Sequence, residues 1–319
     1  MPETRSDIHK ERKKKRSGKK LGCGLLSLLL LAALGTVGWK IYSDIHGTTK
    51  KMFQNVESEK VRDEPVDVKV EDHPFSVLLL GTDSGDLGRT EKGRSDTVMV
   101  MTVNKQKDKT TILSIPRDTY TEIVGKRKKD KINHAYAFGG VSMSINTVQK
   151  LLNIPIDYYV EVNMKGLKEL VDALGGVTVT PPLTFTQDGH EFTEGETVTL
   201  DGESALAYTR MRYNDPAGDY GRQSRQREVI QAAIKKAGSL SSILKYRGLL
   251  KTLENNMKTN LTFDNMVDIF DDYRSAAKNV DQIQLEGKGE KMDGIYYEMM
   301  SDQEIDRVSN LLREQLELD

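Results

Sequence analysis

Five arginines lie within twenty residues, in the stretch YTRMRYNDPAGDYGRQSRQR at 208–227. Arginine offers a planar fork of N–H donors that matches phosphate oxygens in pairs, and it stays protonated at physiological pH. A solvated helix face, a surface for nucleic acid and a pocket for a phosphorylated ligand would each produce such a run. The stretch also contains Asp215 and Asp219. The arginines are Arg210, Arg212, Arg222, Arg225 and Arg227.

Two aspartates earlier in the chain favour the phosphorylated ligand. Asp83 and Asp96 would repel a phosphate unless a divalent cation lay between the carboxylates and the phosphate. Mg²⁺ is a hard ion that proteins hold with one or two carboxylates plus substrate phosphate oxygens, and Mn²⁺ accepts the same ligands. Two carboxylates and several arginines therefore fit together around a metal-bound pyrophosphate.

These residues are expected to meet at one edge of a sheet. Asp83 follows a predicted strand, Arg117 and Asp118 follow another, and Arg94 and Asp96 lead into a third. In α/β sheets, ligands bind beyond the carboxyl ends of the strands. The strands are predicted from continuous apolar runs, which are typical of strands buried on both faces, at 75–81, 97–104 and 110–116.

Structural explanations remain open for several of these residues. Asp83 could cap a turn, and Arg225 and Arg227 could lie on a solvated helix face. Arg117 and Asp118 stand at the end of a buried strand, where a charge is costly without a partner, and this favours a functional role. Common hydrolase motifs are absent: the chain has no G-x-S-x-G, no H-E-x-x-H and no G-K-[ST] phosphate loop.

Strands alternate with helices along the chain, which predicts an α/β fold, a layered α-β-α domain with a central mixed sheet. Asp201 is the expected N-cap of a helix that runs to Arg210. An amphipathic helix at 164–174 should end at Gly175 and Gly176. The other predicted elements are a helix around 143–152, strands at 158–162 and 177–180, a helix at 221–237, two helices within 239–279, a strand at 280–285 and a helix at 302–316.

The N-terminus differs sharply from the rest of the chain. Residues 1–20 carry nine Lys or Arg against three acidic residues, a net charge of +6 that leaves −7 for the other residues. The nineteen residues from Leu21 to Trp39 are uncharged, close to the length of about 20 that spans a bilayer. Trp39 and Tyr42 stand at the far end, where aromatic residues favour the interface. A cleaved signal peptide shares this pattern, but the run is long and lacks a clear cleavage site.

The expected organisation is one anchored chain with an exported body. Basic residues before a span stay on the cytoplasmic side. Cys23 is the only cysteine and lies in the span, so the body can form no intramolecular disulfide. An acidic body outside the cell argues against nucleic acid as a partner. The predicted segments are a cytoplasmic tail 1–20, a transmembrane helix 21–42, an extracellular stalk 43–73 and a domain 74–319, with a core at about 75–235 and a helical extension at about 239–319.

The chain resembles the LytR-CpsA-Psr family of Gram-positive cell-envelope phosphotransferases. The matching strings occur in the family's order, and the short basic N-terminus with a single anchor agrees as well. Together they are far more specific than any one alone. They are VLLLGTDS (77–84), GRSDTVMVMTVN (93–104), LSIPRDTY (113–120), KINHAYAFGG (131–140), GGVTV (175–179), LDGESALAYTRMR (200–212) and GDYGRQSRQR (218–227).

The resemblance implies transfer of an anionic glycopolymer, such as wall teichoic acid, from a polyprenyl-pyrophosphate carrier to peptidoglycan. The acceptor would be the C6 hydroxyl of N-acetylmuramic acid, and the product a phosphodiester. By the same resemblance, Asp83 and Asp96 would hold Mg²⁺ or Mn²⁺, and a long apolar tunnel would hold the lipid tail. Arginines of the matching motifs would bind the pyrophosphate or support its site: Arg94, Arg117, Arg210, Arg212, Arg222 and Arg225.

The resemblance leaves other roles and functions open. Asp118 and Asp219 also lie in matching motifs, and either is a candidate general base. The predicted catalytic residues are therefore Asp83, Asp96, Arg117, Asp118 and Asp219. Phosphoryl transfer depends on positioning and charge neutralisation, so no hydrolytic triad is required. A non-catalytic polyprenyl-phosphate sensor would need the same arginines without turnover, and a DNA-binding regulator is disfavoured by the anchor. The sequence does not name the polymer.

Overall fold

The computed structural model describes residues 51–59, 61–62, 66, 68, 73–83, 93–237, 254–273 and 275–318. Residues 48–319 belong to one unit by their internal contacts. The predicted basic tail, the predicted membrane helix at 21–42 and Cys23 lie outside the described residues. Among the residues that are described, no helix is both long and apolar enough to cross a membrane.

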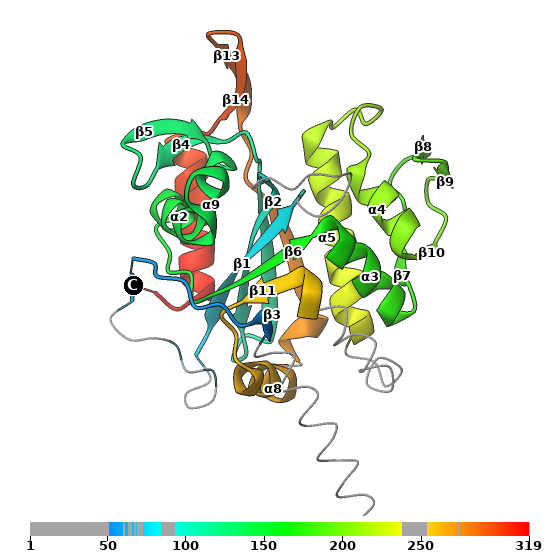
Figure 1. Ribbon diagram of the computed structural model, residues 1–319, viewed down its shortest axis with the longest axis horizontal. Helices are drawn as coiled ribbons and strands as arrows, with labels where there is room; N and C mark the ends of the chain where they lie inside the picture. The colour runs from blue at the N-terminus through cyan, green and yellow to red at the C-terminus, as the bar shows by residue number, and fades with distance from the viewer. Residues whose placement is uncertain are drawn as a thin grey trace, which may run out of the picture. The chain divides into compact units, whose positions relative to one another are not determined.

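A mixed six-stranded sheet forms the centre of the described unit (Figure 1). Across the sheet, the strands are β11 (Met257–Thr259), β6 (Tyr158–Asn163), β1 (Phe75–Thr82), β2 (Ser95–Asn104), β3 (Lys109–Ile115) and β12 (Val280–Gln284). β1 is parallel to β6 and antiparallel to β2, and β3 is antiparallel to β2 and parallel to β12. The carboxyl ends of β1, β3, β6 and β12 therefore share one edge with the start of β2.

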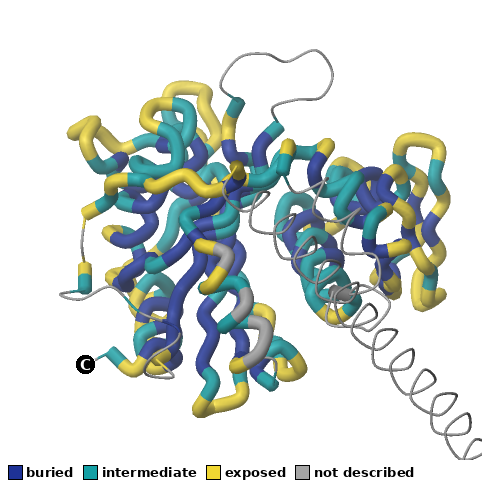
Figure 2. The backbone as a smooth tube through the Cα atoms, turned by 60° about the horizontal axis from the view of Figure 1, so that its bottom comes forward, coloured by how far each residue is buried: buried dark blue, intermediate teal, exposed yellow. Residues whose placement is uncertain are grey.

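Helices cover both faces of the sheet: α2 (His134–Leu152) and α9 (Asp302–Gln315) on one, α5 (Asp219–Ala237) and α8 (Phe263–Asp272) on the other. Alternate residues of each strand point to opposite faces. Leu78 and Leu113 pack with α2 and α9, whereas Val77 and Val103 pack with the α8 side. Figure 2 shows the central strands buried along most of their length. This two-sided burial explains the continuous apolar runs in the sequence.

A second layer of packing supports α5. It consists of α3 (Met164–Leu174), α4 (Gly202–Arg210), the pair β7 (Val177–Val179) with β10 (Val198–Leu200), and the hairpin β8 (Phe185–Gln187) with β9 (His190–Phe192). Phe185, Phe192 and Tyr208 form its aromatic centre, and Val229 of α5 packs against this group. Asp201 caps α4 by accepting from Ser204 N–H, as predicted. The arginine-rich stretch thus links two helices that are each fixed by a buried core.

Two hairpins near the site were not predicted. β4 (Tyr120–Ile123) pairs with β5 (Lys128–Lys131), and β13 (Lys288–Met292) pairs with β14 (Ile295–Met299). The hairpins meet where Glu298 N–H donates to the Asp118 carbonyl at 2.9 Å. One strand of each hairpin, β5 and β13, is rich in charge and mostly not buried, so it lacks the apolar alternation that marks a half-buried strand.

The part of the domain predicted as a helical extension, about 239–319, contains strands as well as helices in its described residues. β11 and β12 complete the two edges of the central sheet, and α9 packs Val308 and Leu312 into the same core as Leu78. The described residues of 254–318 therefore belong to the same sheet and core as the preceding strands. Of the two helices predicted within 239–279, α8 is observed with a short 3₁₀ turn, η1 (Ala276–Lys278), and residues 238–253 lie outside the description.

The predicted stalk also differs from the structure where it is described. Met52 and Val68 are each 1% exposed. Gln54 N–H donates to the Thr259 carbonyl at 2.8 Å, and Tyr159 Oη donates to the Gln54 carbonyl at 2.8 Å. These described positions of the segment 43–73 pack against the body because they supply apolar side chains and an extra backbone pairing to β11.

Candidate active site

The shared sheet edge brings the predicted polar residues together. Thr82 of β1 pairs with Ser95 of β2, so Asp83 lies beside the start of β2 and accepts from Arg94 N–H at 3.2 Å. Arg117 follows the end of β3, next in the sheet, and its Nη1 lies 3.0 Å from Asp96 Oδ1. The antiparallel pairing of β2 with both neighbours therefore produces the arrangement predicted from the strand ends.

Arg117 is the centre of the charged groups at this edge. Its Nε lies 3.7 Å from Asp118 Oδ2, and Asp118 Oδ1 lies 2.7 Å from Lys131 Nζ of β5. Burial alone would lower the pKa of Arg117, but the carboxylates of Asp96, Asp219 and Asp118 outweigh it and raise the pKa. The guanidinium consequently stays charged although it is mostly shielded from water.

The start of α5 adds a second arginine to the same group. Arg222 Nη2 lies 2.7 Å from Asp219 Oδ1, and Arg212 Nε lies 3.7 Å from the same oxygen. Burial lowers the pKa of Arg222, Asp219 and Asp96 oppose this shift, and the nearby Arg117 and Arg212 add to it. Arg117 interacts electrostatically with Asp219, and Arg222 with Asp96, so the groups at the strand ends and those on α5 form one arginine–aspartate cluster. The members of this cluster are Asp96, Arg117, Asp118, Lys131, Arg212, Asp219 and Arg222.

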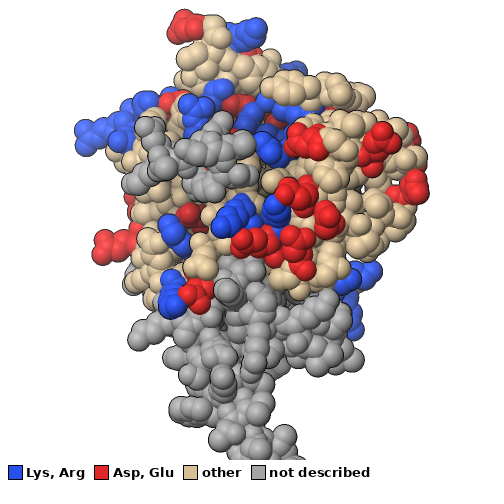
Figure 3. Space-filling model, turned by 45° about the vertical axis from the view of Figure 1, so that its right-hand side comes forward, with Lys and Arg blue, Asp and Glu red and all other residues tan. Residues whose placement is uncertain are grey.

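Arg222 has hydrogen-bonding capacity to spare within this cluster. Its Nε and Nη2 are buried and have no hydrogen-bond partner with acceptable geometry, and neither does Asp219 Oδ1 despite the short contact. Buried guanidinium donors without acceptors are costly unless a ligand satisfies them. Within the cluster, positive and negative side chains alternate. Figure 3 shows that basic and acidic side chains also lie next to one another elsewhere on the surface in view. An oxyanion with several acceptor oxygens fits this donor set.

Asp83 and Asp96 offer two carboxylates to a metal from adjacent strand ends. Among the residues described, no group of three or more His, Cys, Asp or Glu side chains forms a ligand cage. A cation here would need further oxygen ligands, which suits Mg²⁺ completed by substrate phosphate oxygens. The donor set fits the metal only together with a phosphorylated ligand.

Two of the six predicted pyrophosphate arginines have other partners. Arg210 Nη1 lies 3.7 Å from Asp188 Oδ2 in the β8–β9 turn, outside the cluster. The Arg225 side chain is 0% exposed, and its Nη1 lies 2.5 Å from Asp215 Oδ2. Its other nitrogens donate to the carbonyls of Tyr208 and Met211. All three nitrogens of Arg225 are thus engaged within the protein, and its contacts fit a supporting role better than direct binding of the pyrophosphate.

Gly221 explains how Asp215 reaches Arg225. A Cβ at position 221 would lie 1.8 Å from Asp215 Oδ2, so only glycine admits the carboxylate against the helix. Gly221, the second glycine of the GDYGR string, therefore allows the buried ion pair of Asp215 and Arg225 to form.

Sequence reasoning placed Arg227 outside the site, but in the structure Arg227 is buried among neutral hydrogen-bond partners. Arg227 Nη1 donates to Ser114 Oγ of β3 and to Gln284 Oε1 of β12. Asp219, Gln223 and Arg227 recur every four residues and thus share one face of α5, a signal that was available in the sequence. Gln223 and Lys131 were missed as well, since neither lies in a pattern that sets it apart.

The chain belongs to the LytR-CpsA-Psr family. The LytR_cpsA_psr family model matches residues 39–314. The polyisoprenyl-teichoic acid–peptidoglycan teichoic acid transferase TagU of Enterococcus faecalis is 50% identical over 293 residues, 92% of this chain and 95% of the relative.

Solved structures agree with the family assignment. Bacillus subtilis TagU is 46% identical with a TM-score of 0.63 and covers 77% of this chain and 98% of its own. TagT bound to LIIa-WTA is 34% identical with a TM-score of 0.70 and covers 83% of this chain and 99% of its own. The range matched by the family model, residues 39–314, includes the strands of the central sheet and the residues of the cluster.

Proposed function

We propose that this protein transfers an anionic glycopolymer, wall teichoic acid in the first instance, from a polyprenyl-pyrophosphate carrier to peptidoglycan. The observation that carries the proposal is the arginine–aspartate cluster, in which Arg222 presents buried donors without partners and Arg117 lies beside Asp96 at the carboxyl edge of the sheet. The relatives' names support the reaction class, since the Enterococcus faecalis relative at 50% identity is named as a teichoic acid transferase.

The proposed reaction is a single displacement at phosphorus. The C6 hydroxyl oxygen of N-acetylmuramic acid attacks the phosphorus that carries the sugar, and the bond from that phosphorus to the bridging oxygen breaks. Polyprenyl phosphate leaves with the bond electrons, a phosphodiester forms, and the hydroxyl proton passes to a carboxylate. Asp118 and Asp219 are the candidate bases because both lie in the cluster with Arg117.

Arg117, Arg212 and Arg222 would bind the pyrophosphate and neutralise the charge that gathers on its oxygens in the transition state. Arg94, which is exposed next to Asp83, would join them from the loop side. Asp83 and Asp96 would hold Mg²⁺, with Mn²⁺ as a substitute. When bound, the metal supplies further charge neutralisation at the phosphate oxygens.

The proposal includes the location inferred from the sequence. The apolar run from Leu21 to Trp39 would anchor the chain in the cell membrane with the basic tail in the cytoplasm. The domain then faces the cell wall, where both the lipid-linked donor and peptidoglycan are accessible.

The test is transfer by the full-length protein in detergent, supplied with a polyprenyl-pyrophosphate-linked sugar, peptidoglycan oligomers and Mg²⁺. Mass spectrometry would detect the phosphodiester-linked product. We expect much less product with EDTA, with Asp96→Ala and with Arg117→Ala. Arg127→Ala is the matched control, because Arg127 is exposed in the β4–β5 turn.

Transfer by Arg117→Ala at the rate of the unchanged protein would contradict the assigned site. Tight binding of the lipid donor without any product would instead favour a non-catalytic binding protein.

A further inference from the structure

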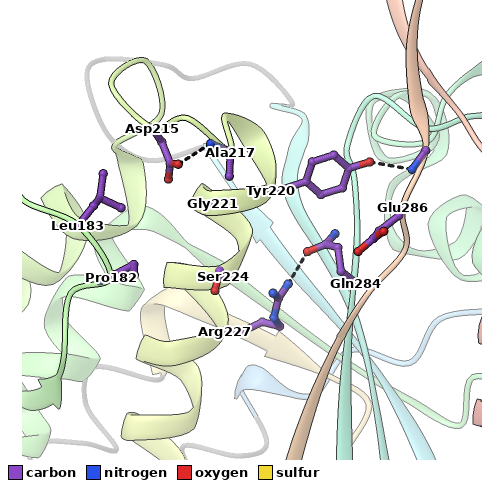
Figure 4. A pocket seen from close by; sticks show the side chains of 11 residues that line it. Pro182, Leu183, Asp215, Ala217, Tyr220, Gly221, Ser224, Arg227, Gln284 and Glu286 are labelled. Atoms are coloured by element: carbon purple, nitrogen blue, oxygen red, sulfur yellow. Dashed lines mark hydrogen bonds between the residues drawn. The ribbon is translucent and has the colours of Figure 1, made fainter. Parts of the chain in front are cut away.

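A pocket of about 540 Å³ lies on the side of α5 next to the arginine–aspartate cluster (Figure 4). Its walls come from the first turns of α5, from the segment after β12 and from the loop that follows β7. Figure 4 shows Arg227 and Gln284 reaching toward each other on one side, with Leu183 and Pro182 on the other. The lining residues used below are Leu183, Ala217, Tyr220, Ser224, Arg227 and Gln284.

Arg227 lines this pocket as a buried cation, and it forms no ion pair among the described residues. Two carboxylates also line the pocket, but Asp215 pairs with Arg225 and Glu286 lies close enough to Arg307 to raise its pKa. It is 7% exposed, and its hydrogen-bond partners Ser114, Gln282 and Gln284 are all neutral. By contrast, Arg117, Arg222 and Arg225 each have an aspartate within 3.0 Å. Burial lowers the pKa of Arg227 to about 10, so it remains charged at neutral pH. A charge in this position is costly unless an anion from outside compensates it.

A chain of hydrogen bonds joins Arg227 to the cluster. Arg227 Nη1 donates to Gln284 Oε1 at 2.6 Å, and Gln284 Nε2 donates to Gln223 Oε1 at 2.7 Å. Gln223 Nε2 then donates to Asp219 Oδ2 at 2.8 Å. An anion that binds Arg227 would therefore act on the orientation of Asp219 through two glutamines.

The other walls of the pocket suit a sugar. Tyr220 is fixed in place because its hydroxyl accepts from Gly287 N–H at 2.8 Å and donates to Glu298 at 2.9 Å. Its ring, with Leu183 and the hydroxyl of Ser224, gives the mixture of flat apolar and polar surface that carbohydrate rings contact. The volume falls in the range that holds small ligands.

We propose that the Arg227 pocket is a subsite for a saccharide that carries an oxyanion, held by its charge on Arg227. The proposal rests on the proposed function, which brings two such saccharides to this edge of the sheet. N-acetylmuramic acid of the acceptor carries a lactyl carboxylate, and the glycopolymer of the donor carries phosphates. The pyrophosphate itself belongs to the arginine–aspartate cluster on the other side of Gln223 and Gln284.

The experiment measures binding without turnover, using the full-length protein in detergent and ligand-observed NMR. N-acetylmuramic acid and N-acetylglucosamine form a matched pair, since they differ by the lactyl ether that bears the carboxylate. Glycerol 3-phosphate tests the phosphate source. We expect the charged sugar to bind about tenfold more tightly than the neutral one, as a charge-assisted hydrogen bond would give.

Two variants locate the binding. Arg227→Gln removes the charge, and Ala217→Trp fills the pocket from an exposed position. Both should abolish the tenfold preference. Asn214→Trp is the control, because it places the same side chain in the same exposed loop without lining the pocket.

The outcomes separate cleanly. Equal affinity for the two sugars together with no binding of glycerol 3-phosphate, or a preference that survives both variants, would overturn the subsite. Binding of glycerol 3-phosphate alone, lost in both variants, would support the subsite and assign it to the donor polymer. If the transfer assay fails while the Arg227-dependent preference persists, the subsite stands and the proposed function falls.

Discussion

Arg222 and Arg225 stand three residues apart on α5, yet they lie in two different kinds of surroundings. Arg225 is sealed against Asp215 and two backbone carbonyls, so each of its nitrogens has a partner inside the protein. Arg222 shares Asp219 with Arg212 and retains buried donors without hydrogen bonds. Arg225 thus stabilises the fold, whereas Arg222 has donors available for a ligand. Unsatisfied donors, and not the presence of an arginine, mark the site.

The sealed pair should produce the largest effect on stability. We expect Arg225→Met to lower the free energy of unfolding by about 3–5 kcal/mol, because Asp215 stays buried without its cation. Chemical denaturation of the full-length protein in detergent measures the change. Normal stability with loss of transfer would reverse the two assignments.

The open cluster should produce the largest effect on rate at little cost to the fold. Arg117→Ala removes the donor at the centre of the cluster, and we expect transfer to fall by about 10²–10³-fold. Initial rates at saturating donor measure the loss, with unfolding curves on the same sample. A loss of stability as large as that of Arg225→Met would place Arg117 with the structural arginines instead.

Removing the metal tests whether transfer depends on a cation held by Asp83 and Asp96. We expect EDTA to reduce transfer by about 100-fold or more. The reason is that a metal that neutralises the phosphate charge stabilises the transition state by several kcal/mol. Asp83→Asn should reduce transfer similarly and make the remaining rate insensitive to EDTA. Arg225→Met protein that still folds should keep its EDTA response, since Arg225 lies outside the cluster.

The link between the Arg227 pocket and the cluster should give the smallest effect. Gln284→Ala breaks the path from Arg227 to Gln223, and we expect about a fivefold lower transfer rate, equivalent to one hydrogen bond. Gln282→Ala is matched to it, because Gln282 also contacts Arg227 but has no bond to Gln223. Equal rates in the two variants would show that the path has no role in transfer.

The sheet edge was predictable from the sequence because each strand and the polar residues at its end are adjacent in the chain. Continuous apolar runs located β1, β2 and β3, and the polar residues at their ends then had to meet. Asp201 was recognisable as a cap for the same reason. By contrast, the strand Lys128–Lys131 is written KKDK, and no periodicity reveals it.

The roles of the arginines on α5 required the tertiary structure. Arg225 and Arg227 differ by two residues and point to different sides of the helix, but the sequence does not say which side meets β3 and which meets α4. Burial and partner decide the role of each, and both are set by elements far away in the chain.

The last strand of the sheet sets the order in which the domain can be completed. β12 pairs with β3 although 170 residues separate Ser114 from Gln284. Such long-range pairing is slow to form, because the intervening chain must be ordered first. Until residues 280–284 are available, β3 is an open edge that invites pairing with other chains. The chain is therefore most prone to aggregate during synthesis, before residues 280–284 have been added.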